Sequence, residues 1–182
     1  MDIKLIREIK NGNKDSFRKL YEIYADGALR TATGITGDRQ LAGDAVQETF
    51  IRVYRNLDSF DIGKPFKPWF YRILTNECSR LLRKKPRMVS LNRMCDEQGC
   101  QVADREREDY TDLYNAIKSL KDIYRVPVVL KYLQGFSEKE MAGILGLNQN
   151  TVKSRLFKAR NMLRKKLEAG EGRIGLGRKG LG

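Results

Sequence analysis

Residues 151–160 carry side chains that suit binding to a nucleic acid. Hydroxyl groups, one aromatic ring and several cations follow closely on one another: Thr151, Lys153, Ser154, Arg155, Phe157, Lys158 and Arg160. Ammonium and guanidinium groups bind phosphates, whereas polar and apolar groups contact base edges in a DNA groove. If this segment is helical, it therefore predicts a DNA-reading helix. The alternative is a solvated cationic helix face, which is the commoner fate of a Lys/Arg run.

The residues that usually carry out catalysis are scarce. The chain has no histidine, which removes the Ser-His and Cys-His arrangements of nucleophilic catalysis. Its three cysteines, Cys78, Cys95 and Cys100, form no CxxC pair, so we expect free thiols and no zinc site. No glycine-rich phosphate-binding motif is present either. We therefore expect a binding protein, with no enzyme activity, metal, cofactor or small-molecule substrate.

The charge balance indicates a polyanionic partner. The 182 residues include 36 Lys and Arg against 23 Asp and Glu, a formal net charge of +13. Such a surplus suits nucleic acid or an anionic membrane surface. No apolar run approaches the roughly 20 residues of a membrane span, and the first residues lack the apolar core of a signal peptide. We therefore expect a cytoplasmic protein.

The cationic segment follows the signature of a helix-turn-helix. Ser137 and Glu140 predict a capping box at the start of one helix, and Gly146 ends it. Asn148 can cap a second helix. The second helix has an apolar stripe at steps of three and four: Val152, Leu156, Ala159, Leu163 and Leu167. Two short helices joined by a tight turn predict a helix-turn-helix, with the cations opposite the stripe.

Helical periodicity also dominates the first half, from residue 3 to about 85. Asp38 is placed to cap a helix over 38–57, and a further helix is expected to begin near Pro68. The sequence thus predicts an all-α protein of two small helical domains, 1–87 and 109–168. A flexible linker, 88–108, is expected between them, and a flexible Gly-rich tail at 169–182.

Four motifs in this order resemble a known family. They are "GNKDSFRKLYEIY" (12–24), "GDAVQETFIRVYRNLDSF" (43–60), "FKPWFYRILTN" (66–76) and "LGLNQNTVKSRLFKAR" (145–160). Over residues 8–168 the chain resembles the extracytoplasmic-function (ECF) sigma factors, of the sigma-70 family of bacterial RNA polymerase subunits. The first half is similar to their second domain and the second half to their fourth.

The resemblance implies a role for each group of residues. A polymerase-binding surface is implied at Asp44, Gln47, Glu48, Ile51 and Arg52. Opening of the −10 promoter element, with binding of its single strand, is implied at Phe60, Asp61, Lys64, Phe66, Tyr71 and Asn76. Aromatic rings stack on unpaired bases, and an amide such as that of Asn76 can read a flipped base. Trp69, Phe70, Ile73 and Leu74 are expected in the core instead. The 151–160 segment would read the −35 element.

The chain departs from the family pattern at Lys67, Pro68, Arg80, Lys121 and Asn150. None of these residues breaks a helix or removes the cationic face, so the departures concern promoter preference more than overall role. The resemblance implies core RNA polymerase, promoter DNA and an anti-sigma factor, which is membrane-anchored in many relatives, as partners.

Other readings of the residues stay open. A helix-turn-helix regulator that acts without polymerase explains 133–167 equally well. A sequence-indifferent nucleic-acid-binding protein explains the charge, and membrane-surface binding by the basic run at 80–87 is a weaker alternative. Direct binding to polymerase distinguishes the first alternative from a sigma factor.

Overall fold

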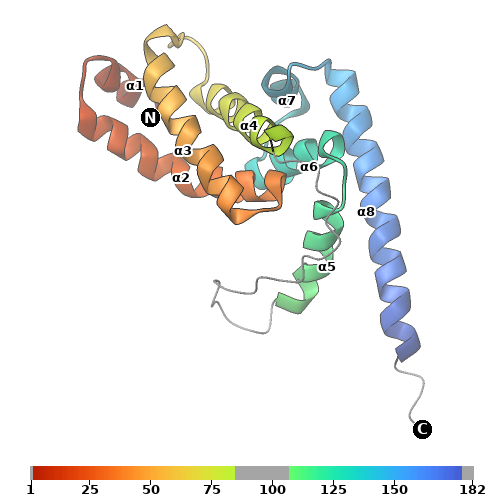
Figure 1. Cartoon of the computed structure of the whole chain (residues 1–182). Helices are drawn as coiled ribbons and strands as arrows, with labels where there is room; N and C mark the ends of the chain where they lie inside the picture. Colours follow the sequence, from red (N-terminus) through yellow and green to blue (C-terminus); the bar gives the residue numbers. More distant parts are fainter. Residues whose placement is uncertain (1, 85–106, 178–182) are drawn as a thin grey trace.

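The computed structural model describes residues 2–84 and 107–177, and every regular element in these ranges is a helix (Figure 1). The N-terminal domain consists of α1 (Asp2–Lys10), α2 (Lys14–Thr36), α3 (Arg39–Asn56), a 3-10 turn (Leu57–Ser59) and α4 (Phe66–Lys84). The C-terminal domain consists of α5 (Arg107–Lys118), α6 (Asp122–Gln134), α7 (Glu138–Leu145) and α8 (Gln149–Gly177). The expected all-α class with two helical domains is confirmed.

In the N-terminal domain, α2, α3 and α4 pack around a cluster of aromatic rings. Asp38 caps α3, since its carboxylate accepts from the N–H groups of Gln40 and Leu41. Pro68 lies in the first turn of α4, where a missing N–H costs no helical hydrogen bond. The ring centroids of Phe50 and Phe70 are 5.3 Å apart. This cluster fixes the position of α4 against the other two helices.

The C-terminal domain contains the helix-turn-helix that the sequence predicts. Ser137 and Glu140 form the capping box of α7, and Gly146 ends the helix with a φ of +63° that favours glycine. Asn148 accepts from the N–H of Asn150 at 2.8 Å, at the start of α8. Most of the expected apolar stripe of α8 is buried: Val152, Leu156, Ala159 and Leu163, with Leu167 half-buried.

The structure differs from the sequence prediction at two boundaries. α5 begins at Arg107, within the 88–108 linker, and α8 continues through Gly177, into the segment expected to be a flexible tail. Lengthening an existing helix adds a hydrogen bond for each residue fixed and avoids the cost of nucleation. Residues 85–106 and 178–182 lie outside the described ranges.

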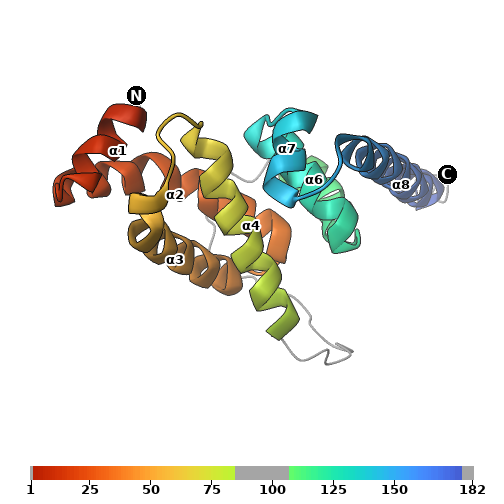
Figure 2. The same cartoon turned by 90° about the horizontal axis from the view of Figure 1, so that it is seen from above.

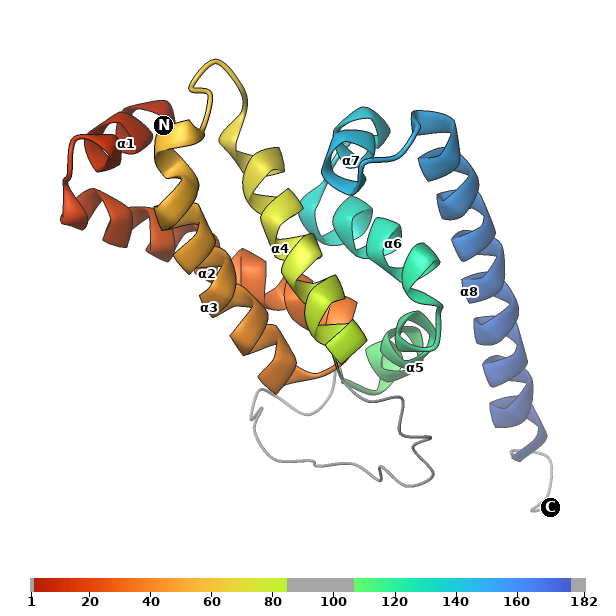
Figure 3. The ribbon, with the colours of Figure 1, turned by 45° about the horizontal axis from the view of Figure 1, so that its top comes forward.

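The two domains pack directly against each other. α6 lies along α2, and α7 lies beside α4 (Figures 2 and 3). The buried guanidinium of Arg125, in α6, donates from Nε to the backbone oxygen of Ile35, in α2, at 2.8 Å. One face of the N-terminal domain is therefore covered by the C-terminal domain, whereas the outer side of α2 and α3 is not.

Candidate nucleic-acid and polymerase interfaces

The candidate DNA-reading residues of α8 lie together on the side of the helix away from its core. Lys153, Ser154, Phe157, Lys158 and Arg160 are exposed, and Thr151 and Arg155 are half-buried. The ring of Phe157 is 59% exposed although it is fully apolar. Lys153 Nζ is 4.0 Å from Glu138 Oε2, a long and exposed ion pair. We call these seven residues the recognition face.

The orientation of the recognition face depends on the start of α7. Glu140 Oε2 accepts hydrogen bonds from the backbone N–H of Ser137 at 2.8 Å and from its hydroxyl at 2.6 Å. These bonds favour the charged carboxylate and hold the pKa of Glu140 below its usual value. Because α7 and α8 are joined by a short turn that Gly146 and Asn148 define, a fixed α7 also fixes the start of α8.

The structure divides the candidate −10 residues into a buried and an exposed group. Phe60 and Phe66 are 5% and 3% exposed, and their rings contact each other and Trp69 within the aromatic cluster. Phe70 and Leu74 are buried as expected, but Trp69 is only partly so. A small helical domain must bury most of its large apolar side chains, and here Phe60 and Phe66 are among them. In this conformation neither ring is available to a base.

Tyr71 is covered by the C-terminal domain. Its side chain is 1% exposed, and its ring lies edge-on against Phe136 with a centroid distance of 5.3 Å. Burial raises the pKa of Tyr71 to about 12, even though hydrogen bonds with Thr31 and Gln134 act in the opposite direction. A DNA contact by Tyr71 therefore requires the two domains to separate.

The remaining candidate −10 residues are exposed. Asp61 and Lys64 lie on the loop before α4, where Asp61 Oδ1 accepts from the Gly63 N–H at 2.9 Å and Lys64 Nζ lies 3.6 Å from Asp61 Oδ2. Asn76 lines a groove of about 210 Å³ between the domains, and Arg155 of the recognition face lines the same groove. The structure thus brings one candidate −10 residue next to one candidate −35 residue.

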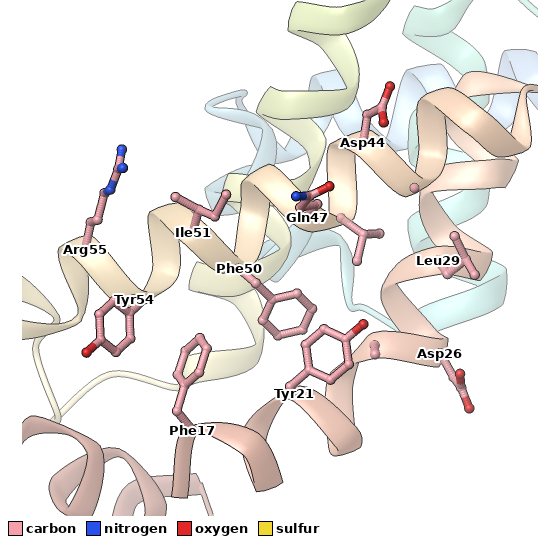
Figure 4. A pocket seen from close by; sticks show the side chains of 13 residues that line it. Phe17, Tyr21, Asp26, Leu29, Asp44, Gln47, Phe50, Ile51, Tyr54 and Arg55 are labelled. Carbon is pink, nitrogen blue, oxygen red and sulfur yellow. The ribbon is translucent and has the colours of Figure 1, made fainter. Parts of the chain in front are cut away.

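Part of the expected polymerase-binding set lines an open groove between α2 and α3. This groove has a volume of about 920 Å³, and Asp44, Gln47 and Ile51 lie on its α3 side (Figure 4). Sequence reasoning missed the residues of α2 and the end of α3 that complete it: Phe17, Tyr21, Asp26, Leu29, Tyr54 and Arg55. The four-residue step from Phe17 to Tyr21 was a usable signal, since it places two rings on one helix face. We call this the α2/α3 groove.

Glu48 and Arg52 take part in an ion-pair network with α4. Arg52 Nε is 3.1 Å from Glu48 Oε1 and 2.9 Å from Glu77 Oε1. The carboxylate of Glu77, in α4, is almost fully buried and also pairs with Arg80 Nε at 2.7 Å. The structure thus separates the expected set into groove residues and residues that tie α3 to α4.

Other kinds of site find little support in the parts of the chain that the structure describes. Those parts contain no cluster of His, Cys, Asp or Glu side chains that could hold a metal ion. Among the described helices, none combines the length and apolar character that a membrane crossing requires. Cys78 is a buried free thiol whose pKa burial raises to about 12, which makes it unreactive. Cys95 and Cys100 lie outside the described residues.

Comparison with protein families matches both domains. Residues 20–88 match the family model of Sigma-70 region 2, and residues 110–163 match that of Sigma-70, region 4. These ranges contain all the candidate −10 and polymerase-binding residues and the whole recognition face.

Comparison with individual proteins agrees. The chain is 34% identical to the ECF RNA polymerase sigma factor SigW of Bacillus subtilis, over 90% of this chain and 95% of that protein. It is 29% identical to SigM of the same organism, over 80% of this chain and 91% of that protein.

Two solved structures are similar in fold. One is CnrH in complex with the cytosolic domain of CnrY, with a TM-score of 0.72 and 26% identity, covering 92% of this chain and 97% of that one. The other is the sigma factor RpoE in complex with the anti-sigma factor NepR from Bartonella quintana, with a TM-score of 0.71 and 28% identity, covering 86% and 98%. From the two matched regions and the identity to SigW, the chain belongs to the family of ECF RNA polymerase sigma factors.

Proposed function

We propose that this chain is a promoter-specificity subunit that binds bacterial core RNA polymerase, recognises −35 and −10 elements and promotes strand opening. The exposed recognition face on the second helix of a helix-turn-helix is the observation that carries this proposal. A helix of this kind enters the DNA major groove, where cations bind phosphates and side chains contact base edges. Lys158 and Arg160 would bind phosphates, and the exposed Phe157 would make an apolar contact, for example with a thymine methyl group.

The polymerase would dock on the α2/α3 groove. Its exposed Tyr21, Ile51 and Tyr54 offer apolar area, and carboxylates lie at its sides, Asp26 on α2 and Asp44 on α3. Carboxylates would repel DNA, whereas they complement a basic protein surface. The polymerase would carry out the phosphodiester chemistry, so this chain would contribute recognition and no catalysis of its own.

The −10 element would be opened at the N-terminal domain. Asn76, Asp61 and Lys64 are already exposed there, and Tyr71 would join them once the C-terminal domain moves away. An amide can hydrogen-bond to the Watson-Crick edge of an unpaired base, and a tyrosine ring can stack on it.

An anti-sigma factor would regulate the protein. This proposal is supported by the similar structure of RpoE, which was solved in complex with the anti-sigma factor NepR. The protein would then work in the cytoplasm and would be held at the membrane if its anti-sigma factor is membrane-anchored.

Transcription by purified core polymerase tests the proposal. With genomic fragments as template, transcript starts that appear only with the protein, and that share two spaced upstream elements, are the expected result. Ile51→Glu places a charge in the α2/α3 groove and should abolish these starts. Ile23→Glu is the matched control, because Ile23 is also exposed, on α2, but lies outside that groove.

A helix-turn-helix regulator that acts without polymerase is the second candidate. It predicts sequence-selective DNA binding with no dependent transcript starts and no effect of Ile51→Glu on that binding. The transcription assay and a DNA-binding assay on the same fragments therefore distinguish the two functions.

A further inference from the structure

The loop before α4 carries two of the exposed candidate −10 residues, and aromatic packing fixes its two ends. Phe60 and Phe66 place their rings in the aromatic cluster, with centroids 5.6 Å apart. Within the loop, the Lys64 N–H donates to the Asp61 backbone oxygen at 3.0 Å, beside the bond from the Gly63 N–H to the Asp61 carboxylate. These two bonds shape the loop internally, but they do not join it to another element.

A lysine of α1 ties this loop to the rest of the N-terminal domain. Lys10, the last residue of α1, donates from its ammonium group to the backbone oxygens of Asp58 and Phe60, each at 2.9 Å. α1 packs on the 3-10 turn that precedes the loop, although 50 residues separate Lys10 from Phe60 in the sequence (Figure 2). An ammonium group has three donors, so these two bonds and one bond to water satisfy it.

The direction of the Lys10 side chain is informative. A cation in the last turn of a helix often interacts with the free carbonyls of that same helix. Backbone bonds already close this end of α1, where the Gly12 N–H donates to the Ile9 oxygen at 2.9 Å. The Asn13 N–H donates to the Glu8 oxygen at 3.0 Å. Lys10 instead satisfies carbonyls of a segment that is distant in sequence.

α1 offers a fixed base for this contact. The side chains of Ile6 and Ile9 are buried, and α1 packs on α2. The Ser16 hydroxyl, near the start of α2, donates to Glu8 Oε2 at 2.6 Å, and the Ser16 N–H donates to the capping Asn13 side chain at 3.1 Å. The packing of α1 on α2 therefore determines the position of Lys10 independently of the loop.

The bond to the Phe60 oxygen determines the direction in which the loop leaves the aromatic cluster. The Phe60 carbonyl group and the nitrogen and Cα of Asp61 belong to one planar peptide unit. Contacts with Trp69, at a centroid distance of 4.8 Å, hold the Phe60 side chain, and the Lys10 bond holds its backbone oxygen. With both held, the positions of Asp61 and of Lys64 after it depend on Lys10.

We propose that Lys10 is a positioning residue of the −10 site, whose two hydrogen bonds hold the loop so that Asp61 and Lys64 meet the DNA strand in one arrangement. Lys10 acts through the loop and touches no DNA itself. A restrained loop has less conformational entropy to lose when it binds a strand. The effect on strand opening rests on the proposed function, whereas the restraint of the loop does not.

The first test measures the mobility of the loop in the full-length protein alone, by NMR relaxation of the backbone N–H groups. Lys10→Met keeps a long side chain but removes its donors, whereas Lys10→Arg keeps donors at the same position. Lys4→Met is the matched control, because Lys4 is an exposed lysine on the same helix and its loss changes the net charge equally.

We expect order parameters of about 0.85 for residues 61–64 in the unchanged protein, in Lys10→Arg and in Lys4→Met, and of about 0.6 or less in Lys10→Met. Acrylamide quenching of Trp69 fluorescence should also increase in Lys10→Met, since the Phe60 ring covers part of the indole. Equal order parameters in the unchanged protein and in Lys10→Met would overturn the proposal. A loop that is already mobile in the unchanged protein would overturn it without any variant.

Strand opening in the polymerase complex then tests the effect on function. The template is a promoter that the transcription assay identifies. Lys10→Met should lower the permanganate reactivity of its −10 thymines roughly 5-fold, the change expected for the loss of one hydrogen bond. Binding to duplex −35 DNA should be unchanged. Lys10→Arg should restore the reactivity, and Lys4→Met should not alter it.

The combined results separate a positioning role from the alternatives. A mobile loop with normal strand opening in Lys10→Met would refute the functional part of the proposal and leave the restraint of the loop established. An unchanged loop with a DNA-binding salt slope reduced by roughly 1 would make Lys10 a phosphate contact instead. Absence of all protein-dependent starts with the unchanged chain would refute the proposed function, and the order parameters would still report on Lys10.

Discussion

The two regions that would bind promoter DNA are presented in opposite ways. The recognition face of α8 is largely exposed, with even Phe157 in solvent, whereas Phe60, Phe66 and Tyr71 are buried. Cations are costly to bury unless their hydrogen bonds are satisfied, as those of the Arg125 guanidinium are, whereas aromatic rings gain stability wherever they find a core. The difference suggests that −35 recognition is available at once and that −10 binding depends on rearrangement.

The largest effect on this contrast should come from Leu156→Ala, which removes a buried side chain beneath the recognition face. We expect a loss of about 2–5 kcal/mol in the free energy of unfolding of the C-terminal domain, as for other large-to-small core substitutions. Urea unfolding followed by circular dichroism measures the loss. Fluorescence of Trp69, the single tryptophan, reports the N-terminal domain separately and should change less.

Phe157→Ala is the control for Leu156→Ala. Phe157 is adjacent in sequence but exposed, so its loss should leave stability within about 0.5 kcal/mol of the unchanged protein. A large loss of stability in Phe157→Ala would contradict the division of α8 into a buried stripe and an exposed face.

Asn76→Ala should impair the function of the −10 region while leaving that of the −35 region unchanged. Loss of the amide should impair strand opening roughly 10-fold. The edge of the unpaired base would lose its hydrogen-bond partner, and an unpaired buried polar group costs about 1–3 kcal/mol. Binding to duplex −35 DNA should be unchanged. Permanganate reactivity of −10 thymines in the polymerase complex measures opening, and Asn115→Ala, at an exposed asparagine on α5, is the control. Normal reactivity in Asn76→Ala would remove this residue from the −10 site.

Lys158→Ala should have a smaller effect, a salt-dependent weakening of DNA binding by the exposed recognition face. Loss of one phosphate contact should reduce the log-log salt slope of DNA binding by roughly 1. Lys153→Ala should behave similarly, whereas Lys19→Ala, at an exposed position on α2, should not. Titrations of DNA with each variant at several salt concentrations measure this slope. An unchanged slope would exclude the replaced lysine as a phosphate contact.

The smallest expected effect is on the pH-dependent stability of α7, the helix that orients the recognition face. The folded-state pKa of Glu140 is lowered, so the charged carboxylate stabilises α7 above the pKa of the unfolded state, and this stabilisation is lost as pH falls through the folded-state value. Glu140→Gln should therefore lower the free energy of unfolding by no more than about 1 kcal/mol at neutral pH. In acid, the stabilities of the variant and of the unchanged protein should become equal. Thermal unfolding at several pH values measures it, and a pH-independent difference would contradict a role for the charge.

Local signals in the sequence predicted the helix-turn-helix well. The capping box of Ser137 and Glu140, the glycine that ends α7 and the stripe of α8 each depend on residues within one or two turns. Each therefore appears in the structure where the sequence placed it. Helical periodicity also predicted that the N-terminal domain is helical, and Asp38 and Pro68 marked the starts of α3 and α4, but no signal used separated α1 from α2.

Contacts between distant segments escaped prediction. Nothing in the 66–76 motif distinguishes Tyr71, which Phe136 covers, from Trp69, which is partly exposed, because the covering residue lies in another domain. The α2 side of the α2/α3 groove was missed because it lies on another helix than the α3 motif, although the step from Phe17 to Tyr21 was a local signal for it. Tertiary packing decides which members of an aromatic-rich motif face solvent.

The buried carboxylate of Glu77 affects how substitutions on α3 can be interpreted. It is shared by Arg52 and Arg80, so replacing Arg52 with alanine leaves a negative charge in the interior with one partner fewer. Such a change costs stability before any partner protein is added. A weak polymerase complex of an Arg52 variant would thus report a loosened junction between α3 and α4 as readily as a lost intermolecular contact. Only a paired replacement at Glu77 would separate the two.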